Sequence, residues 1–304
     1  MTDSAVRSSQ IIEGVDGTPI HAWIYPAVGR TAADGPVPAI VMAHGIGGIK
    51  AAGLAPFAEA FSAAGYTCVV FDYRHWGQSG GEPREMLSMA AQQADYRAVL
   101  QHARTMDSVD PDRIVLWGTS FAGMHVVELA ATETYLVGAI AQCPLVDGLA
   151  GILNVPPARG VRLMRQALLD RLGAGRGHEA RYLPLIVDEG ELGVIATKDA
   201  LLGQDRLAPT DGTDWPNRIT ARSLLDVTFS RPARRASQVR CPLLMVVAEE
   251  DTMAPTGPAV KVAAKAPRGE LYRSQGGHYD LYAGGPAHDD VLAVELAFLA
   301  RVTS

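Results

Sequence analysis

The sequence is poor in cysteine and has no long apolar run, and each shortage excludes a class of protein. Three cysteines in 304 residues are too few for a disulfide framework. No run of about 18 apolar residues occurs, so no transmembrane helix is predicted. The N-terminal stretch MTDSAVRSSQ also lacks the apolar core of a secretory signal peptide. We therefore expect a cytoplasmic protein with no membrane partner.

Positive charge is also scarce, which bears on the choice of partner. The 27 Lys and Arg residues are outnumbered by 33 Asp and Glu, so the formal net charge is −6 at pH 7. Nucleic acids and anionic membranes attract basic surfaces, and neither is therefore an expected partner. The length allows either one large α/β domain or a domain with an insertion. The sequence leaves both a monomer and a homodimer open.

The three cysteines are expected to be buried free thiols. Cys68 lies within an apolar run, and Cys143 and Cys241 each precede a proline beside one. None of them has a histidine near it in the sequence that would recommend it as a nucleophile.

Apolar strands alternate with helices along most of the chain. A hairpin is expected over residues 11–25, because Asp16-Gly17 supplies a turn between two runs of strand-favouring residues. Alternating strands and helices are typical of the α/β class, with a mostly parallel central sheet and helices on both faces. The expected strands are 38–43, 66–71, 114–117, 136–141, 242–248 and 270–273, and the first two expected helices are 54–64 and 86–104.

This alternation stops in the second half of the chain. We predict an inserted cap at residues 149–235, between two parts of one core domain at 1–148 and 236–304. Within the cap, apolar residues at helical spacing predict helices over 158–172 and 219–229. The apolar segment 182–195 is either a loop over a cleft or an ordinary excursion packed on the core.

The stretch IVLWGTSFAGMHVVELA at 114–130 predicts a buried strand that turns sharply into a helix. Ser120 lies at the apex of this turn. Gly118 lacks the Cβ that would crowd such a turn, and the helix N-terminus offers free N–H groups to a developing negative charge. Ala122 stands where the second glycine of G-x-S-x-G is expected, and Gly123 follows it. Ser120 is therefore the candidate nucleophile.

A serine hydroxyl needs a base to take its proton, and an imidazole serves best when a carboxylate orients it. Asp251 follows the apolar run PLLMVVA, and His278 follows the next expected strand in QGGHYD. Because the carboxyl ends of parallel strands share one edge of a sheet, we expect both residues to lie near Ser120. The alternatives for the acid are Glu249, Glu250 and Asp147, of which Asp147 follows the strand at 136–141.

Together these motifs resemble the α/β-hydrolase superfamily, in which the triad follows the chain order Ser, acid, His. More narrowly, HGIGGIK at 44–50, FDYRHWGQSGGEP at 71–83 and GTSFAG at 118–123 resemble two groups. These are peptidase S15-like esterases and polyketide-processing acyl hydrolases or transferases. His75 stands where such proteins usually carry the first glycine of D-x-R-G-x-G-x-S.

The resemblance implies an α/β-hydrolase fold and an oxyanion hole built from two backbone N–H groups. One belongs to Phe121, directly after the nucleophile, and the other to Ile46, with Gly47 as the alternative to Ile46. His44 is expected to fix its loop by hydrogen bonding. Tyr73, Arg74 and Trp76 are expected to pack their loop more than to line an acyl pocket.

The sequence therefore predicts a serine hydrolase that cleaves a carboxylic ester or thioester of a hydrophobic small molecule through an acyl-enzyme on Ser120. The apolar pieces of the predicted cap favour a medium-sized hydrophobic acyl group or ring as its substrate. An acyltransferase using the same triad and a catalytically silent binding protein on the same scaffold are the alternatives. No metal or cofactor is implied, because the H-E-x-x-H, cysteine-ligand, calcium-loop and nucleotide-loop patterns are missing or incomplete. Neither the acyl length nor the leaving group follows from the sequence.

Overall fold

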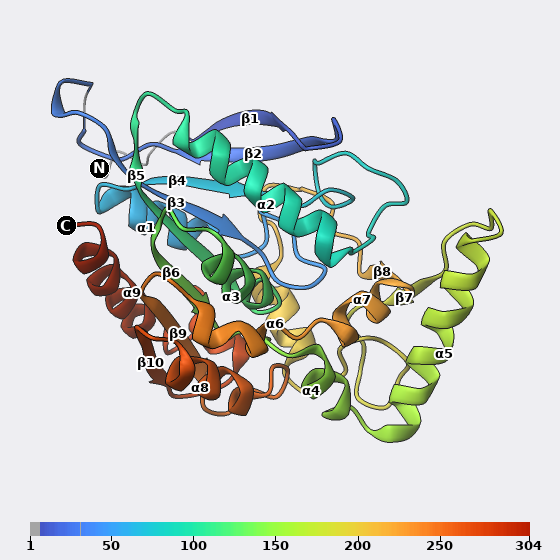
Figure 1. Cartoon of the computed structure of the whole chain (residues 1–304). Coiled ribbons are helices and arrows are strands. Elements are labelled where there is room, and N and C mark those ends of the chain that lie inside the picture. Colours follow the sequence, from blue (N-terminus) through green and yellow to red (C-terminus); the bar gives the residue numbers. More distant parts are fainter. Residues whose placement is uncertain (1–6, 31) are drawn as a thin grey trace.

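The computed structural model describes residues 7–30 and 32–304 and contains a central sheet flanked by helices (Figure 1). Residues 1–6, the start of the N-terminal stretch MTDSAVRSSQ, lie outside the described residues. Within the described residues, the central sheet has eight strands in the order β1-β2-β4-β3-β5-β6-β9-β10. Their bounds are β1 (Ser8–Glu13), β2 (Pro19–Tyr25), β4 (Thr67–Phe71), β3 (Val37–Ala43), β5 (Val109–Thr119), β6 (Leu136–Gln142), β9 (Leu243–Ala248) and β10 (Gly269–Ser274).

Most neighbouring strands run parallel, as the alternating pattern predicts. β2 pairs antiparallel with both β1 and β4, and the remaining neighbours in the sheet are parallel. The predicted hairpin is confirmed as β1 and β2. The connection between the two strands is longer than the predicted dipeptide Asp16-Gly17 and spans residues 14–18. The other predicted strands are found with ends shifted by a few residues, and β5 begins earlier than expected, at Val109.

Helices cover both faces of the sheet, and alternate residues of the strands divide between the two layers. In β5, Ile114 and Leu116 pack in one core and Val115 and Trp117 in the other. The first core includes α2 (Met89–Arg104), α3 (Ala122–Thr132) and α8 (Thr256–Lys265), and the second includes α1 (Ala55–Ala63) and α9 (His288–Val302). This alternation buries both faces and confirms the predicted α/β architecture.

The predicted cap contains several helices and a small second sheet, and α5 runs along the right-hand edge of Figure 1. The helix predicted over 158–172 is confirmed as part of α5. The helix predicted over 219–229 is wrong in its first turn, because residues 218–220 form a strand that pairs with 182–184. The elements are α4 (Gly148–Leu153), α5 (Pro157–Ala174), β7 (Tyr182–Pro184), α6 (Ala200–Leu207), β8 (Arg218–Thr220) and α7 (Ser223–Phe229). The division into core and cap itself stays a prediction.

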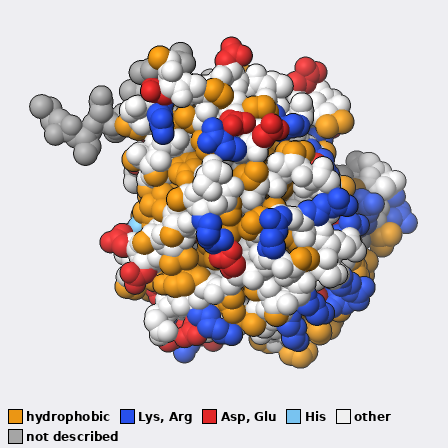
Figure 2. Space-filling view, turned by 60° about the vertical axis from the view of Figure 1, so that its left-hand side comes forward, with side chains coloured by type: hydrophobic (Ala, Val, Ile, Leu, Met, Phe, Trp, Pro, Cys, Tyr) orange, Lys and Arg blue, Asp and Glu red, His pale blue; other side chains and the backbone are white. Residues whose placement is uncertain are grey.

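Three short 3-10 helices complete the described elements: η1 (Ala32–Asp34), η2 (Pro232–Gln238) and η3 (His278–Leu281). None of the helices in the described ranges is both long and apolar enough to cross a membrane. On the face shown in Figure 2, hydrophobic, acidic and basic side chains are mixed, and Lys and Arg are more frequent toward the right. This face therefore presents no uniform field of one sign.

Candidate active site

The turn between β5 and α3 holds Ser120 in the geometry expected of a nucleophile. Its φ angle is 56°, in the left-handed region that non-glycine residues adopt rarely and mostly at strained turns. The Ser120 N–H donates to the Gln142 carbonyl at 2.8 Å, and the Ser120 carbonyl accepts from the Gly123 N–H at 2.9 Å. The turn thus fixes the serine at the carboxyl edge of the sheet.

The departure from G-x-S-x-G at Ala122 is accommodated by its neighbours. A Cβ placed on Gly118 would lie 2.9 Å from the Cβ of Ala122, so the alanine methyl occupies space that a glycine at 118 leaves free. A Cβ on Gly123 would lie 2.3 Å from the Cβ of Pro144. The close backbone approach at this turn therefore depends on Gly118 and Gly123 and tolerates alanine at 122.

Asp251 and His278 form a buried pair. His278 Nδ1 lies 2.7 Å from Asp251 Oδ2, and the two side chains are 2% and 1% exposed. The other carboxylate oxygen, Oδ1, accepts from the backbone N–H groups of Met253 and Ala254, each at 2.8 Å. An ionised carboxylate can only accept, so Nδ1 carries the proton and Nε2 is left to face the site.

The alternative acids are engaged elsewhere or exposed to solvent. Asp147 accepts from the Ala150 N–H at the start of α4 and forms a 2.8 Å ion pair with Arg231. Glu249 and Glu250 are exposed. Of the four acids considered from the sequence, Asp251 is the one that contacts His278.

The Nε2 atom of His278 has a neighbour that the sequence did not identify. Cys143 Sγ lies 3.7 Å from this nitrogen and 3.4 Å from Thr119 Oγ1. Among the described residues no hydrogen bond joins Ser120 Oγ to His278, although both residues line the same cavity. Cys143 lies 135 positions before His278, so proximity in sequence could not reveal the contact. Its place directly after a predicted strand was the available signal. As expected, all three cysteines are free and buried.

The pKa of His278 is raised well above its ordinary value of 6.5. Burial by itself lowers the pKa, because it disfavours the imidazolium. The Cys143 sulfur and the Asp251 carboxylate both act in the opposite direction and outweigh burial, and Asp251 also supplies a hydrogen bond to the charged form. The neutral form of the ring, which can accept a proton, is therefore populated at higher pH than in a free histidine.

In the described part of the chain, the two N–H groups expected to form an oxyanion hole are unpaired. Within the described ranges, neither the Ile46 nor the Phe121 N–H donates a hydrogen bond to another group. The Gly47 N–H is also unpaired there, so it remains the alternative to Ile46. The Gly47 carbonyl accepts from Trp215 Nε1 at 2.7 Å, which ties this turn to the predicted cap.

His44 makes the contacts expected of a residue that fixes the conformation of its loop. Its Nδ1 lies 3.0 Å from the Gly45 carbonyl oxygen, and its ring packs edge-on against Tyr73 at 4.8 Å between centroids. Its Nε2 is buried and has no partner among the described residues. Burial lowers the pKa of this histidine, which keeps the ring neutral.

The DYRHWG loop packs against the core and does not line the cavity in the described part of the chain. Arg74 pairs with the buried Asp95 at 2.6 Å, and Trp76 Nε1 donates to the Met86 carbonyl at 2.9 Å. His75 has a φ of 71°, the left-handed conformation that glycine adopts without strain. This explains why the resembled motif carries glycine there and why histidine still preserves the turn.

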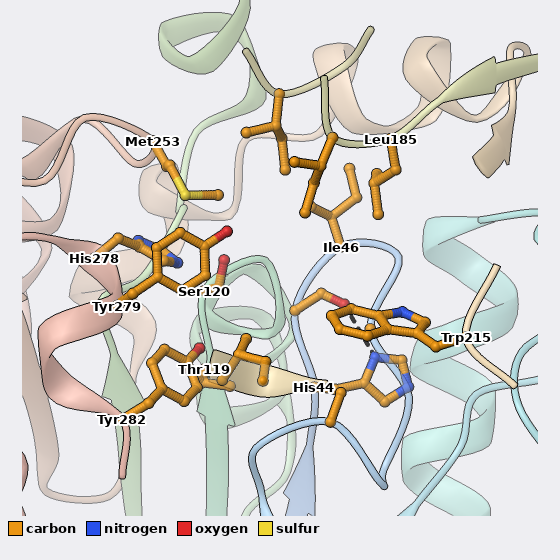
Figure 3. Close-up of a pocket in the computed structure, with 16 residues that line it drawn as sticks. His44, Ile46, Thr119, Ser120, Leu185, Trp215, Met253, His278, Tyr279 and Tyr282 are labelled. Atoms are coloured by element: carbon orange, nitrogen blue, oxygen red, sulfur yellow. Dashed lines mark hydrogen bonds between the residues drawn. The ribbon is translucent and has the colours of Figure 1, made fainter. Parts of the chain in front are cut away.

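A narrow cavity of about 40 Å³ lies beside Ser120. In Figure 3, Ser120 lies between His278 and Tyr279 on one side and Ile46 and Trp215 on the other, with Leu185 above. Residues 185, 186 and 195 line the cavity, so the segment predicted over 182–195 does lie over a cleft. Among the described residues no group of three or more His, Cys, Asp or Glu is placed to hold a metal ion.

The sheet order and the strand-turn-helix at Ser120 define an α/β-hydrolase fold. A family model described as Hydrolase_4, serine aminopeptidase S33, matches residues 34–278. The chain therefore belongs to this family of hydrolases. The narrower likeness to S15-like esterases stays a prediction.

Individual relatives carry several activities in their names. The quorum-quenching protein AidA of Acinetobacter baumannii (strain MDR-ZJ06) is 38% identical over 265 residues, 87% of this chain and 86% of that protein. A thiohydrolase of Eupenicillium brefeldianum is 27% identical over 262 residues, 83% of this chain and 80% of that protein. The crystal structure of the α/β-hydrolase GrgF from Penicillium sp. sh18 superposes with a TM-score of 0.83 at 26% identity, covering 98% of this chain and 99% of that chain.

Proposed function

We propose that this protein is a serine hydrolase that cleaves a small, hydrophobic carboxylic ester or thioester through an acyl-enzyme on Ser120. The observation that carries the proposal is the 2.7 Å contact between His278 and Asp251 at the wall of the cavity that Ser120 lines. Membership of a hydrolase family and a relative named thiohydrolase support the reaction class. The motif likeness to esterases and acyl hydrolases points the same way.

In the proposed first step, Ser120 Oγ attacks the acyl carbonyl carbon while His278 Nε2 takes the hydroxyl proton. Asp251 orients the ring and stabilises the imidazolium. The C–O or C–S bond then breaks, and the leaving group takes the proton from Nε2. Water repeats the sequence at the acyl-enzyme and releases the acid. Nε2 must exchange its Cys143 contact for the serine, and such catalytic hydrogen bonds often tighten only when substrate binds.

The negative charge that develops on the carbonyl oxygen needs fixed donors. We assign this role to the unpaired N–H groups of Ile46 and Phe121. Donors already held in place cost no reorganisation at the moment of reaction, and loss of one typically slows an acyl transfer by about 10²–10³-fold.

A fluorophosphonate probe tests the nucleophile. We expect the wild-type protein and Ser9→Ala, an exposed control in β1, to be labelled, and Ser120→Ala to remain unlabelled and inactive on p-nitrophenyl acetate. Labelling of Ser120→Ala, or no labelling of folded wild type, overturns the proposal. The second result would favour a silent binding protein.

The same assay separates hydrolysis from acyl transfer. Adding an alcohol or amine acceptor diverts the acyl group into a new ester or amide if the protein is a transferase, whereas a hydrolase releases the free acid.

A further inference from the structure

We propose that the cavity beside Ser120 selects acyl groups of two or three carbons, and that Leu185 and Leu207 set this limit. The inference rests on the proposed acyl-enzyme at Ser120 and names the substrate class of that site. It departs from the sequence-based expectation of a medium-sized hydrophobic acyl or ring substrate, because the acyl part is now short.

The volume of the cavity limits the size of the acyl group. The cavity measures about 40 Å³. A single water needs about 10–15 Å³, and an engineered protein cavity that binds benzene measures about 150 Å³. The space beside Ser120 therefore accepts about three or four heavy atoms, which suits an acetyl or propionyl group and excludes an acyl group that contains a ring.

Leu185 contacts the turn at residues 46–47, which carries the proposed oxyanion-hole N–H of Ile46 and is called the oxyanion turn below. Leu185 is 2% exposed, and a Cβ placed on Gly47 would lie 2.1 Å from Leu185 Cδ2. The leucine side chain thus packs directly on the backbone of Gly47, next to the N–H of Ile46 (Figure 3). An acyl chain whose carbonyl oxygen pointed to this turn would meet Leu185 within a few atoms.

The segment that carries Leu185 is held in place by several hydrogen bonds. Asn217 makes two hydrogen bonds to Ile186, the residue directly after Leu185. Its Oδ1 accepts from the Ile186 N–H at 2.8 Å, and its Nδ2 donates to the Ile186 carbonyl at 2.7 Å. The Ile195 N–H donates to the Leu185 carbonyl at 2.8 Å. Because Asn217 and Ile195 both bond to this segment, it is not expected to move aside for a longer acyl chain.

Leu207 lines the cavity from the end of α6, which is also anchored to the core. Arg206 Nη1 donates at 2.7 Å to the carbonyl oxygen of Tyr279, the residue directly after His278. Leu207 is therefore held near the proposed base by its neighbour in sequence. Leu185 and Leu207 belong to two separately anchored segments, so each can be tested alone.

The test compares p-nitrophenyl acetate, butyrate and octanoate. For the wild type we expect kcat/KM to fall by at least about 10-fold from acetate to octanoate, the scale of discrimination that misfitting methylenes give in an apolar pocket. Leu185→Ala and Leu207→Ala should each raise the ratio of octanoate to acetate by about 10-fold. Leu202→Ala is the matched control, because Leu202 lies on the same helix and is 74% exposed.

Wild-type preference for octanoate, or an equal shift in Leu202→Ala, overturns the inference. If one variant fails to fold, the other still decides the outcome. A protein that is labelled at Ser120 but shows no size limit contradicts the short-acyl inference alone. A protein that is neither labelled nor active contradicts the proposed function as well.

Discussion

His278 has a neighbour on each ring nitrogen, and the balance between them governs the proposed chemistry. The Asp251 carboxylate stabilises the imidazolium, while Nε2 faces the sulfur of Cys143. The Cys143 sulfur and the carboxylate that orients the base together outweigh burial and raise the pKa of His278 above that of a free imidazole. A base of raised pKa is stronger but is available only at higher pH.

The raised pKa of His278 should determine how kcat/KM depends on pH. Because the pKa of His278 is raised above 6.5 in the folded protein, kcat/KM should rise with pH and reach half its maximum above pH 6.5. Asp251→Asn should move this midpoint to lower pH, since one of the two groups that favour the imidazolium loses its charge while Cys143 remains, and should reduce kcat by up to about 10⁴-fold. Initial rates with subsaturating p-nitrophenyl acetate between about pH 5 and 9 measure both effects.

Glu249→Gln is the control for this profile, because Glu249 is an exposed carboxylate two positions away. It should leave the midpoint and the rate unchanged. A kcat/KM that does not vary between about pH 5 and 8 would argue that His278 is not the base.

At the scale of single residues, the candidate site was predictable where each side chain follows an apolar strand. Ser120, Asp251 and His278 all do, and the sheet brings their positions to one edge. Cys143 also follows a strand, but its contact with His278 depends on its own φ of 36° and on the conformation of the His278 loop. Neither this φ angle of Cys143 nor the conformation of the His278 loop has a signal in the local sequence.

Among the helices, α9 carries a buried carboxyl group that the proposed reaction does not use. Glu295 is fully buried, and Trp117 Nε1 donates to its Oε2 at 3.0 Å. Its Oε1 has no partner among the described residues. Burial raises the pKa of Glu295 to about 8, although the bond from Trp117 acts in the opposite direction. The group is therefore protonated in the folded protein at neutral pH.

The free energy of unfolding should consequently fall as pH rises between 4.5 and about 8. In this window the unfolded chain has lost the Glu295 proton while the folded chain retains it, so raising the pH favours unfolding by up to about 1.4 kcal/mol per unit. Glu295→Gln, which stays neutral and keeps an acceptor for Trp117, should remove this slope. Urea denaturation at several pH values measures it.

The exposed Asp290→Asn on the same helix serves as the control and should retain the wild-type slope. Equal pH dependence in wild type and Glu295→Gln would show that Glu295 does not hold its proton in the folded state.

The elements themselves were predictable where burial is continuous. Runs such as residues 243–248 and 37–43 are apolar throughout because both faces of the sheet are covered. The wrong first turn of the predicted helix at 219–229 has the opposite origin. Residues 218–220 pair with 182–184, a contact across more than thirty positions, and local periodicity carries no information about it.

Across the whole molecule, the predicted cap is bonded to both loops that carry the proposed chemistry. Trp215 donates to the Gly47 carbonyl in the oxyanion turn, and Arg206 donates to the Tyr279 carbonyl beside the base. The segments that bound the cavity are thus also the segments that hold the proposed catalytic groups in place. A change in the cap is expected to alter the rate as well as the substrate size.

Trp215→Phe tests this coupling, because phenylalanine keeps an aromatic ring and removes the N–H that bonds Gly47. With that bond lost, the turn carrying Ile46 is free to shift, and small misplacement of catalytic groups costs up to about 10²-fold in rate. We therefore expect kcat on p-nitrophenyl acetate to fall by about 10- to 100-fold with a smaller change in KM.

Tyr182→Phe is the matched control for this substitution. It also removes an aromatic donor from the predicted cap, since the Tyr182 hydroxyl donates to the Arg84 carbonyl at 3.0 Å, but neither Tyr182 nor Arg84 lines the cavity. Its kcat should stay near the wild-type value while both variants are compared for thermal stability. Equal loss of kcat in the two variants would mean that the cap acts through stability alone, and a lower Tm with unchanged kcat in Trp215→Phe would show that its bond to Gly47 does not position the oxyanion turn.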